Sequence, residues 1–176
     1  MEEVAVCPVS GEAAEEERIN FLTHLAGLAL SFVGWVVLLG LAWRQDNPLL
    51  TASCWIYGAS LILCYAASTI YHVSVAVPMK RWLRIIDHSC IFLLIAGTYT
   101  PFALGPLFEI SGITLLLVEW GIALAGICFK VWHIDRFRVL SVVAYLVMGW
   151  LVVFHMPELY ETLSTSAMGW LIAGGA

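Results

Sequence analysis

The sequence predicts an all-α fold, a polytopic membrane helical bundle. Of the 176 residues, 61% are hydrophobic and only 12% are charged, and the mean hydropathy is +0.91. A soluble domain carries about a quarter charged residues, so this chain is too apolar for a water-exposed surface. The apolar residues also form runs of roughly 20, which is the length that a helix needs to cross a bilayer.

Five such runs follow one another along the chain, at residues 19–43, 49–73, 85–104, 111–131 and 138–156. A sixth begins near residue 166, but only about ten of its residues precede the chain end, which is too few to span. The pattern therefore predicts a transmembrane domain over residues 19–176, with five full spans and a truncated sixth. On this interpretation the domain is incomplete at its C-terminus.

Residues 1–18 differ in composition from the rest of the chain. They hold six glutamates and no basic residue before Arg18, and they account for much of the net charge of −5. Such a segment is typical of a solvated tail, so we expect an acidic, disordered, cytoplasmic segment. No basic stripe indicates nucleic acid binding. The expected partners are membrane lipids, and the oligomeric state stays open.

The basic residues indicate which way the spans run. With five spans, seven basic residues fall on one side of the membrane and only Arg44 on the other. The seven are Arg18, Lys80, Arg81, Arg84, Lys130, Arg136 and Arg138. Because positively charged loops stay in the cytoplasm, the N-terminus is expected there.

Polar residues of the second and third spans gather at this inner end. The second span closes with Ser68 and His72, which share a helical face because they are four residues apart. The third span opens near Asp87, which the hairpin returns to about the depth of His72. Imidazole and carboxylate groups at one level in a membrane indicate a metal or proton-transfer site.

Simpler interpretations of these residues remain open. A histidine at a span end also occurs as an interfacial residue that reaches toward lipid headgroups. Asp87 has Arg84 one helical turn away as an alternative partner. One histidine and one aspartate also cannot complete a tetrahedral zinc site.

The first span adds a second polar stripe at the same end. Glu17, Asn20, His24 and Gly27 are spaced 3, 4 and 3 apart, so they lie on one helical face. Glu17, Asn20 and His24 are candidates for a shell that orients a metal ligand, and Gly27 would let another helix approach closely. The alternative is an ordinary helix start, where acidic residues favour the dipole. Glu119, in the outer half of the fourth span, has no evident partner.

Three blocks of residues resemble a known family. They are Glu17-Arg-Ile-Asn20-Phe-Leu-Thr23-His24-Leu-Ala-Gly27, Ser68-x-x-x-His72, and Arg84-Ile-Ile-Asp87-His88-Ser-x-Ile91 continuing to Ala96-Gly97-Thr98-Tyr99-Thr100-Pro101. With these blocks the chain resembles the bacterial hemolysin III proteins, which belong with the progestin and adipoQ (adiponectin) receptors. They are more distantly similar to alkaline ceramidases. The resemblance covers nearly the whole chain after the acidic segment.

The resemblance implies a seven-helix protein of the bacterial inner membrane, with zinc near the cytoplasmic leaflet. It implies that His72 binds zinc directly, that Asp87 contacts it through water, and that Ser68 lies near it. Two further histidine ligands belong to an HxxxH motif in the seventh helix. They are therefore expected beyond residue 176.

The leading hypothesis for function is zinc-dependent hydrolysis of a lipid amide or ester by the complete protein. Asp87 would take the proton of the attacking water, and Ser68 would help to stabilise the developing charge. One alternative is a membrane-perturbing, pore-forming cytolysin. Another is a non-catalytic, receptor-like or structural membrane protein.

Overall fold

The structure, a computed structural model, describes residues 6–133 and 138–175 of the chain. Over these residues the regular structure is helical, apart from one isolated β-bridge, and this confirms the predicted all-α class. In chain order the elements are α1 (Ala14–Trp43), α2 (Pro48–Val73), α3 (Val77–Ala103), η1 (Phe108–Gly112), α4 (Ile113–His133), α5 (Arg138–Trp150), η2 (Leu151–His155), α6 (Met156–Thr162) and α7 (Thr165–Gly175). The element η1 is a π-helix and η2 is a 3₁₀-helix.

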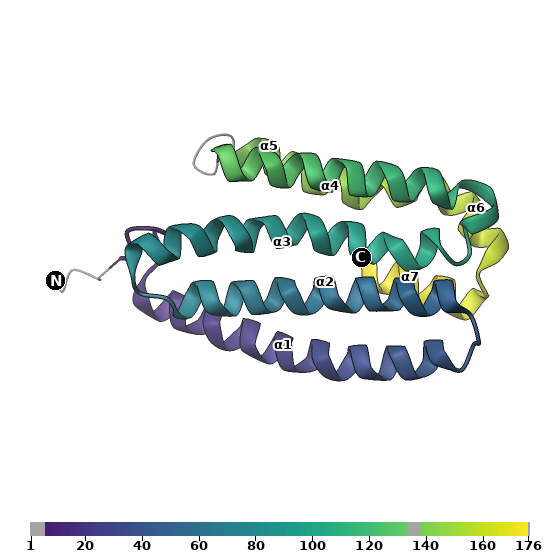
Figure 1. Cartoon of the computed structure of the whole chain (residues 1–176), viewed down its shortest axis with the longest axis horizontal. Helices are drawn as coiled ribbons and strands as arrows, with labels where there is room; N and C mark the ends of the chain where they lie inside the picture. The colour runs from purple at the N-terminus through teal and green to yellow at the C-terminus, as the bar shows by residue number, and fades with distance from the viewer. Residues whose placement is uncertain (1–5, 134–137, 176) are drawn as a thin grey trace.

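The long helices lie side by side and run up and down, so their connections collect at two ends (Figure 1). Helix α1 packs on α2, α2 on α3, α3 on α4, and α4 on α5. One end holds the starts of α1 and α3 and the end of α2, and we call it the amino-terminal end. The other holds the α1–α2 connection and α6, and we call it the distal end (Figure 1).

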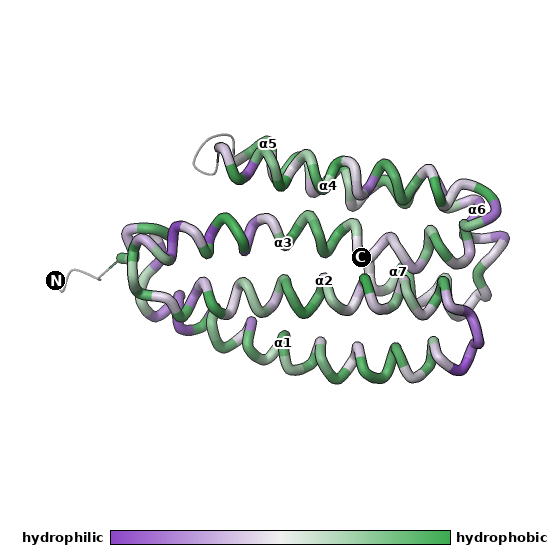
Figure 2. The backbone as a smooth tube through the Cα atoms, viewed as in Figure 1, coloured by the Kyte–Doolittle hydropathy of each residue, from purple (hydrophilic) through white to green (hydrophobic). Residues whose placement is uncertain are grey.

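Within the described residues, five stretches are long and apolar enough to cross a membrane. They are Ala14–Trp43, Pro48–Val73, Val77–Ala103, Phe108–Trp132 and Val139–Thr162. Large apolar side chains stand exposed along these helices, and hydrophilic residues gather toward the bundle ends (Figure 2). Contact between this apolar surface and lipid chains has no hydrophobic cost, whereas contact with water would be unfavourable. The five predicted spans are confirmed, and α7 matches the start of the predicted sixth.

Two helices begin earlier than their predicted spans. Helix α1 starts at Ala14 instead of near residue 19, and α3 starts at Val77 instead of near 85. Hydropathy alone missed these turns because they carry charged side chains. Their local signals are Glu16, whose carboxylate accepts a hydrogen bond from the Ala13 backbone, and a proline in the first turn of α3.

The acidic segment that the sequence predicted to be disordered has a defined path over residues 6–13. It doubles back through a turn in which the Gly11 amide donates to the Cys7 carbonyl at 2.9 Å and Gly11 has φ +83°. A glycine suits this position because side chains disfavour positive φ. Val9 is buried, and its carbonyl accepts a hydrogen bond from Arg84 at 3.2 Å. Residues 1–5 lie outside the described part of the chain.

Close approach of α2 and α3 depends on a glycine. A Cβ atom built on Gly97 would lie 2.2 Å from the Ser60 Oγ and 2.9 Å from the Ser60 Cβ. The Ser60 hydroxyl donates to the Tyr57 carbonyl at 2.7 Å, which fixes its position. Helix α1 approaches α2 in the same way at Gly27, where a Cβ atom would lie 2.3 Å from the Tyr65 ring, as the sequence predicted.

We therefore expect Gly97→Ala to destabilise the bundle by about 1–3 kcal/mol, because the added methyl group must push α3 away from α2. The matched control is Gly34→Ala on α1, where a Cβ atom would meet nothing within 4 Å. That change should leave stability equal or raise it by up to about 1 kcal/mol. Thermal unfolding in detergent, followed by circular dichroism, measures both. Equal melting temperatures for the two variants would contradict this packing.

A buried tyrosine joins α3 to the end of α5. The Tyr99 hydroxyl lies 2.8 Å from the Met148 carbonyl and 2.9 Å from the Gly149 carbonyl, and it accepts from the Val152 amide at 2.9 Å. These are the residues where the α-helix changes into the 3₁₀-helix η2 and leaves backbone groups unpaired. The tyrosine satisfies these groups, which a membrane interior requires.

Glu119 lies on α4, in the interior of the bundle. Its side chain is fully buried, and neither carboxylate oxygen has a hydrogen-bond partner among the described residues. The next residue, Trp120, donates from its ring nitrogen to the Thr100 hydroxyl at 3.2 Å and holds α4 against α3. The core around Glu119 is therefore packed, with no partner for its carboxyl group within the described chain.

Candidate metal centre at the amino-terminal end

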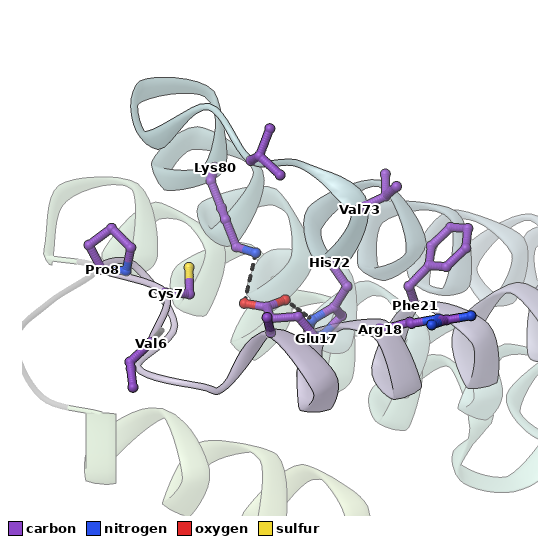
Figure 3. A pocket seen from close by; sticks show the side chains of 11 residues that line it. Val6, Cys7, Pro8, Glu17, Arg18, Phe21, His72, Val73 and Lys80 are labelled. Atoms are coloured by element: carbon purple, nitrogen blue, oxygen red, sulfur yellow. Dashed lines mark hydrogen bonds and ion pairs between the residues drawn. The ribbon is translucent and has the colours of Figure 1, made fainter. Parts of the chain in front are cut away.

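Three helix ends meet at the amino-terminal end of the bundle, and each contributes one polar side chain (Figure 3). Glu17 comes from the first turn of α1, His72 from the last turn of α2, and Lys80 from the first turn of α3. Only residues 74–76 separate α2 from α3, so the hairpin holds the last two side chains close together. The folded segment of residues 6–13 covers them from the N-terminal side.

Glu17 is the hub of this cluster. One of its oxygens, Oε2, lies 2.8 Å from His72 Nδ1, and the other, Oε1, lies 2.7 Å from Lys80 Nζ. The Ser10 hydroxyl also donates to Oε1. All three charged or ionisable side chains are nearly buried, at 10% exposure for Glu17, 9% for His72 and 4% for Lys80.

The pairing determines which histidine nitrogen is available. A carboxylate only accepts hydrogen bonds, so the proton of neutral His72 lies on Nδ1, where Glu17 accepts it. The Nε2 lone pair of His72 is then free to bind a metal. Metal-binding histidines almost always donate their other N–H to a carboxylate, a carbonyl or water in this way, and the partner fixes the ring orientation.

Lys80 explains how a carboxylate is tolerated at this depth. A cation in the first turn of α3 opposes the helix dipole, and burial of an unpaired ammonium group is costly. The Glu17 carboxylate compensates both penalties, and the Tyr71 ring adds a second contact, 5.0 Å from Lys80 Nζ to its centroid. The ion pair therefore holds α1 and α3 in register around His72.

The rest of the predicted polar stripe lies beside this cluster. The His24 ring stacks on the His72 ring, with centroids 5.5 Å apart and planes 4° from parallel. Asn20 donates from Nδ2 to Glu12 Oε2 at 2.9 Å, which fixes a second carboxylate nearby. The structure thus gathers Glu17, Asn20 and His24 around His72.

The two predicted catalytic residues lie deeper than the Glu17–His72 pair. Ser68 is buried on α2, one turn before His72. The Asp87 side chain is 15% exposed, and its carboxylate lies within electrostatic range of Tyr71 on α2 and of His24 on α1. Asp87 therefore faces the same stretch of α2 that carries Ser68 and His72. His88 Nδ1 lies 2.8 Å from the Arg84 carbonyl oxygen and 3.7 Å from Asp87 Oδ2.

The donor atoms present fit a metal ion of the zinc class. Glu12, Glu17 and His72 each offer one ligand atom, and these atoms lie within 4.8 Å of one another. Imidazole nitrogen and carboxylate oxygen are the ligands that zinc takes from such residues. Because Glu17 already bonds Lys80 and His72, its arrangement favours orientation of the histidine over direct ligation.

A cavity of about 430 Å³ opens beside the cluster (Figure 3). Glu17, His72 and Lys80 line it on one side, while Phe21 and Val73 give it apolar walls. Ser68 and Asp87 are not among its lining residues. Its size and its few polar groups are typical of small-molecule pockets.

The sequence interpretation missed Ser10, Glu12 and Lys80 as members of this cluster. Ser10 and Glu12 lie in the segment expected to be disordered, where composition predicts no contacts. Lys80 carried a usable signal, because a lysine in the first turn of a helix needs an acidic partner, and Glu17 is the acidic residue of the polar stripe.

Known proteins resemble this chain over most of its length. The model of the family described as "Haemolysin-III related" matches residues 13–176. The hemolysin-3 homolog of Bacillus subtilis is 44% identical over 161 residues, which cover 92% of this chain and 76% of the relative. Hemolysin-3 of Bacillus cereus is 38% identical over 161 residues, covering 92% of this chain and 74% of that protein.

A more distant relative is the human monocyte to macrophage differentiation factor, which is 26% identical over 170 residues and covers 89% of this chain and 68% of its own length. No solved structure matches the chain significantly. The five apolar spans and these relatives make the protein an integral, multi-pass membrane protein. The chain belongs to the Haemolysin-III related family.

Proposed function

We propose that the complete protein is a zinc-dependent hydrolase of lipid amides or esters. The observation that carries the proposal is the 2.8 Å contact between Glu17 Oε2 and His72 Nδ1, which leaves Nε2 of a nearly buried histidine available to a metal. A histidine that only reached toward lipid headgroups would not need a buried carboxylate on its other nitrogen.

His72 would hold the metal, Glu17 would orient His72, and Lys80 would neutralise Glu17. The resemblance adds two histidine ligands that lie outside the 176 residues. When bound, zinc supplies a Lewis acid that polarises a carbonyl group and makes water more acidic.

The remaining chemistry belongs to side chains on α2 and α3. Asp87 would accept the proton of the attacking water and then pass it to the leaving nitrogen or oxygen as the acyl bond breaks. The Ser68 hydroxyl would donate a hydrogen bond to the negative charge that develops on the carbonyl oxygen. Ser68 is buried and the Asp87 side chain is only 15% exposed, so a substrate would have to enter between helices.

A lipid is the substrate class that this position favours. The cluster lies where apolar helix surfaces meet a polar bundle end (Figure 2), so we expect it near the depth where a lipid carries its amide or ester group. Arg18, Lys80, Arg81 and Arg84 all belong to the starts of α1 and α3. Their charge supports a cytoplasmic amino-terminal end, in a bacterial inner membrane.

The proposal is tested with the complete protein, which includes the residues expected to supply the two further histidine ligands, reconstituted in vesicles that contain ceramide or a diacylglycerol. Release of fatty acid is measured by mass spectrometry, with added zinc or with a chelator. We expect release that the chelator stops, and a rate about 10²–10⁴-fold lower for Asp87→Asn.

The matched control is Asp46→Asn, in the α1–α2 connection at the distal end. Asp46 has φ 50°, a conformation that asparagine also tolerates, so this variant should retain the full rate. If zinc-loaded protein releases no fatty acid, or if Asp87→Asn matches the wild-type rate, the hydrolase proposal is wrong.

The name hemolysin-3, given to both Bacillus relatives, favours a second function, permeabilisation of membranes. Dye leakage from vesicles separates the two. Leakage that persists in His72→Ala would support a pore-forming protein, because a pore does not require the metal ligand. Leakage-free vesicles with fatty acid release would support the hydrolase.

A further inference from the structure

A second cluster of metal-binding side chain types lies at the distal end of the bundle. The Ser111 hydroxyl lies 3.0 Å from His155 Nδ1 and donates to Glu158 Oε2. The same histidine nitrogen lies 3.2 Å from Glu158 Oε2. A hydroxyl oxygen, an imidazole nitrogen and a carboxylate oxygen thus converge on one point.

Three separate backbone elements bring these atoms together. Ser111 lies in the π-helix η1, His155 ends the 3₁₀-helix η2, and Glu158 lies in the first turn of α6. Each element departs from the regular long helices at this bend. Local π-helices are found frequently at functional sites, because the extra residue redirects a side chain.

The backbone around the cluster is held firmly. Leu107, just before η1, and Leu159, just after Glu158, are both fully buried in one hydrophobic cluster. The Ser111 amide donates to the Leu107 carbonyl at 3.1 Å. Gly112 lies so close to the end of α3 that a Cβ atom would be 2.0 Å from the Ala103 carbonyl oxygen. The three donor atoms are therefore positioned before any ligand arrives.

The contacts exclude a serine-hydrolase triad. In such a triad the carboxylate and the serine bond opposite nitrogens of the histidine ring. Here Ser111 and Glu158 both contact His155 through Nδ1. His155 therefore cannot act as a base for Ser111 through one nitrogen while Glu158 orients it through the other. The three polar atoms instead lie close together, as the ligands of one ion would.

The carboxylate also lacks the compensation that Glu17 has. Glu17 has a lysine at 2.7 Å, whereas no lysine or arginine forms an ion pair with Glu158 within residues 6–133 and 138–175. The side chains are partly open, with 19% of His155 and 30% of Glu158 exposed. Water could therefore complete the coordination of an ion, as it does in zinc sites with three protein ligands.

We propose that Ser111, His155 and Glu158 form a second cation site, which binds a divalent transition metal ion of the zinc class. His155 Nδ1 and the Glu158 carboxylate would be its principal ligands, with the histidine proton moved to Nε2 when the ion binds, and the Ser111 hydroxyl would be the weaker third. The site lies at the opposite end of the bundle from His72, and so on the other face of the membrane (Figure 1). It does not depend on the hydrolase proposal.

The test titrates the purified 176-residue chain in detergent with Zn²⁺, by isothermal titration calorimetry. The variant is Glu158→Gln, which keeps an oxygen for the Ser111 hydroxyl but loses the negative charge. The matched control is Glu161→Gln on the same helix, whose residue is exposed. We expect Glu158→Gln to weaken one ion by at least about tenfold, and Glu161→Gln to bind as the wild type does.

The same comparison in a His72→Ala background separates the two ends of the bundle, because the second ion should persist there. Thermal unfolding gives a further measurement. In the His72→Ala background, Zn²⁺ should raise the melting temperature of Glu161→Gln but not that of Glu158→Gln, since binding to the folded state stabilises it. Equal affinities for the two variants would overturn the proposal and leave the cluster a hydrogen-bonded link between η1 and α6.

Discussion

Replacing Glu17 by glutamine should destabilise the bundle by about 3–5 kcal/mol, because it leaves the Lys80 ammonium group buried without its counter-charge. The Lys80 side chain is only 4% exposed, and the Glu17 carboxylate lies 2.7 Å away. The same change should weaken metal binding about 10–100-fold, since a neutral amide orients His72 less firmly and makes its free nitrogen less basic. Chemical denaturation in detergent and metal titration measure the two effects.

The matched control for this change is Glu15→Gln, which removes the same charge from an exposed position in the same helical turn. It should alter stability by no more than about 0.5 kcal/mol. Lys80→Met is the second arm, because it removes the buried ammonium group as well. The double variant should be less destabilised than the sum of the single variants. Simple additivity would show that the Glu17–Lys80 contact carries no interaction energy.

Replacing His72 by alanine should remove the zinc ion at the amino-terminal end and lipid hydrolysis, while the helical bundle still forms. The fold should survive because Glu17 keeps Lys80 and Ser10 as partners after the imidazole is lost. Fatty acid release, zinc content and circular dichroism on the same preparation separate loss of the ligand from loss of the fold. A variant that is folded and lacks the ion at the amino-terminal end yet hydrolyses lipid would refute the role given to the metal.

The predicted spans correspond to the structure because hydropathy reports directly on burial in lipid. The predicted starts of α1 and α3 were too late, because the first turns of both helices carry charged residues. The first turns of α1 and α3 carry Glu17 and Lys80, and each alone looks suited to water. The two side chains form an ion pair at 2.7 Å, and this pair lets both helices begin with charged residues. Composition cannot reveal such a contact between residues that are far apart in the sequence.

The candidate site could be predicted in part from helical spacing. The SxxxH motif and the Glu17–Asn20–His24 stripe indicated one helical face each, and the hairpin indicated a common depth. The specific partner of His72 was not predictable, because α1 and α2 can turn relative to each other and several acids lie near residue 17. The cluster of Ser111, His155 and Glu158 was not predicted from the sequence. It depends on a π-helix and a 3₁₀-helix, whose positions a regular 3.6-residue period does not predict.

The most direct test of the account is the zinc affinity of wild type, His72→Ala, Glu17→Gln and Glu15→Gln, measured by competition with a chromogenic chelator. We expect His72→Ala to lose the zinc ion at the amino-terminal end, and Glu17→Gln to bind that ion about 10–100-fold more weakly. Glu15→Gln should bind it as the wild type does. Equal zinc affinity in all four proteins would contradict the claim that a Glu17-oriented His72 is a metal ligand.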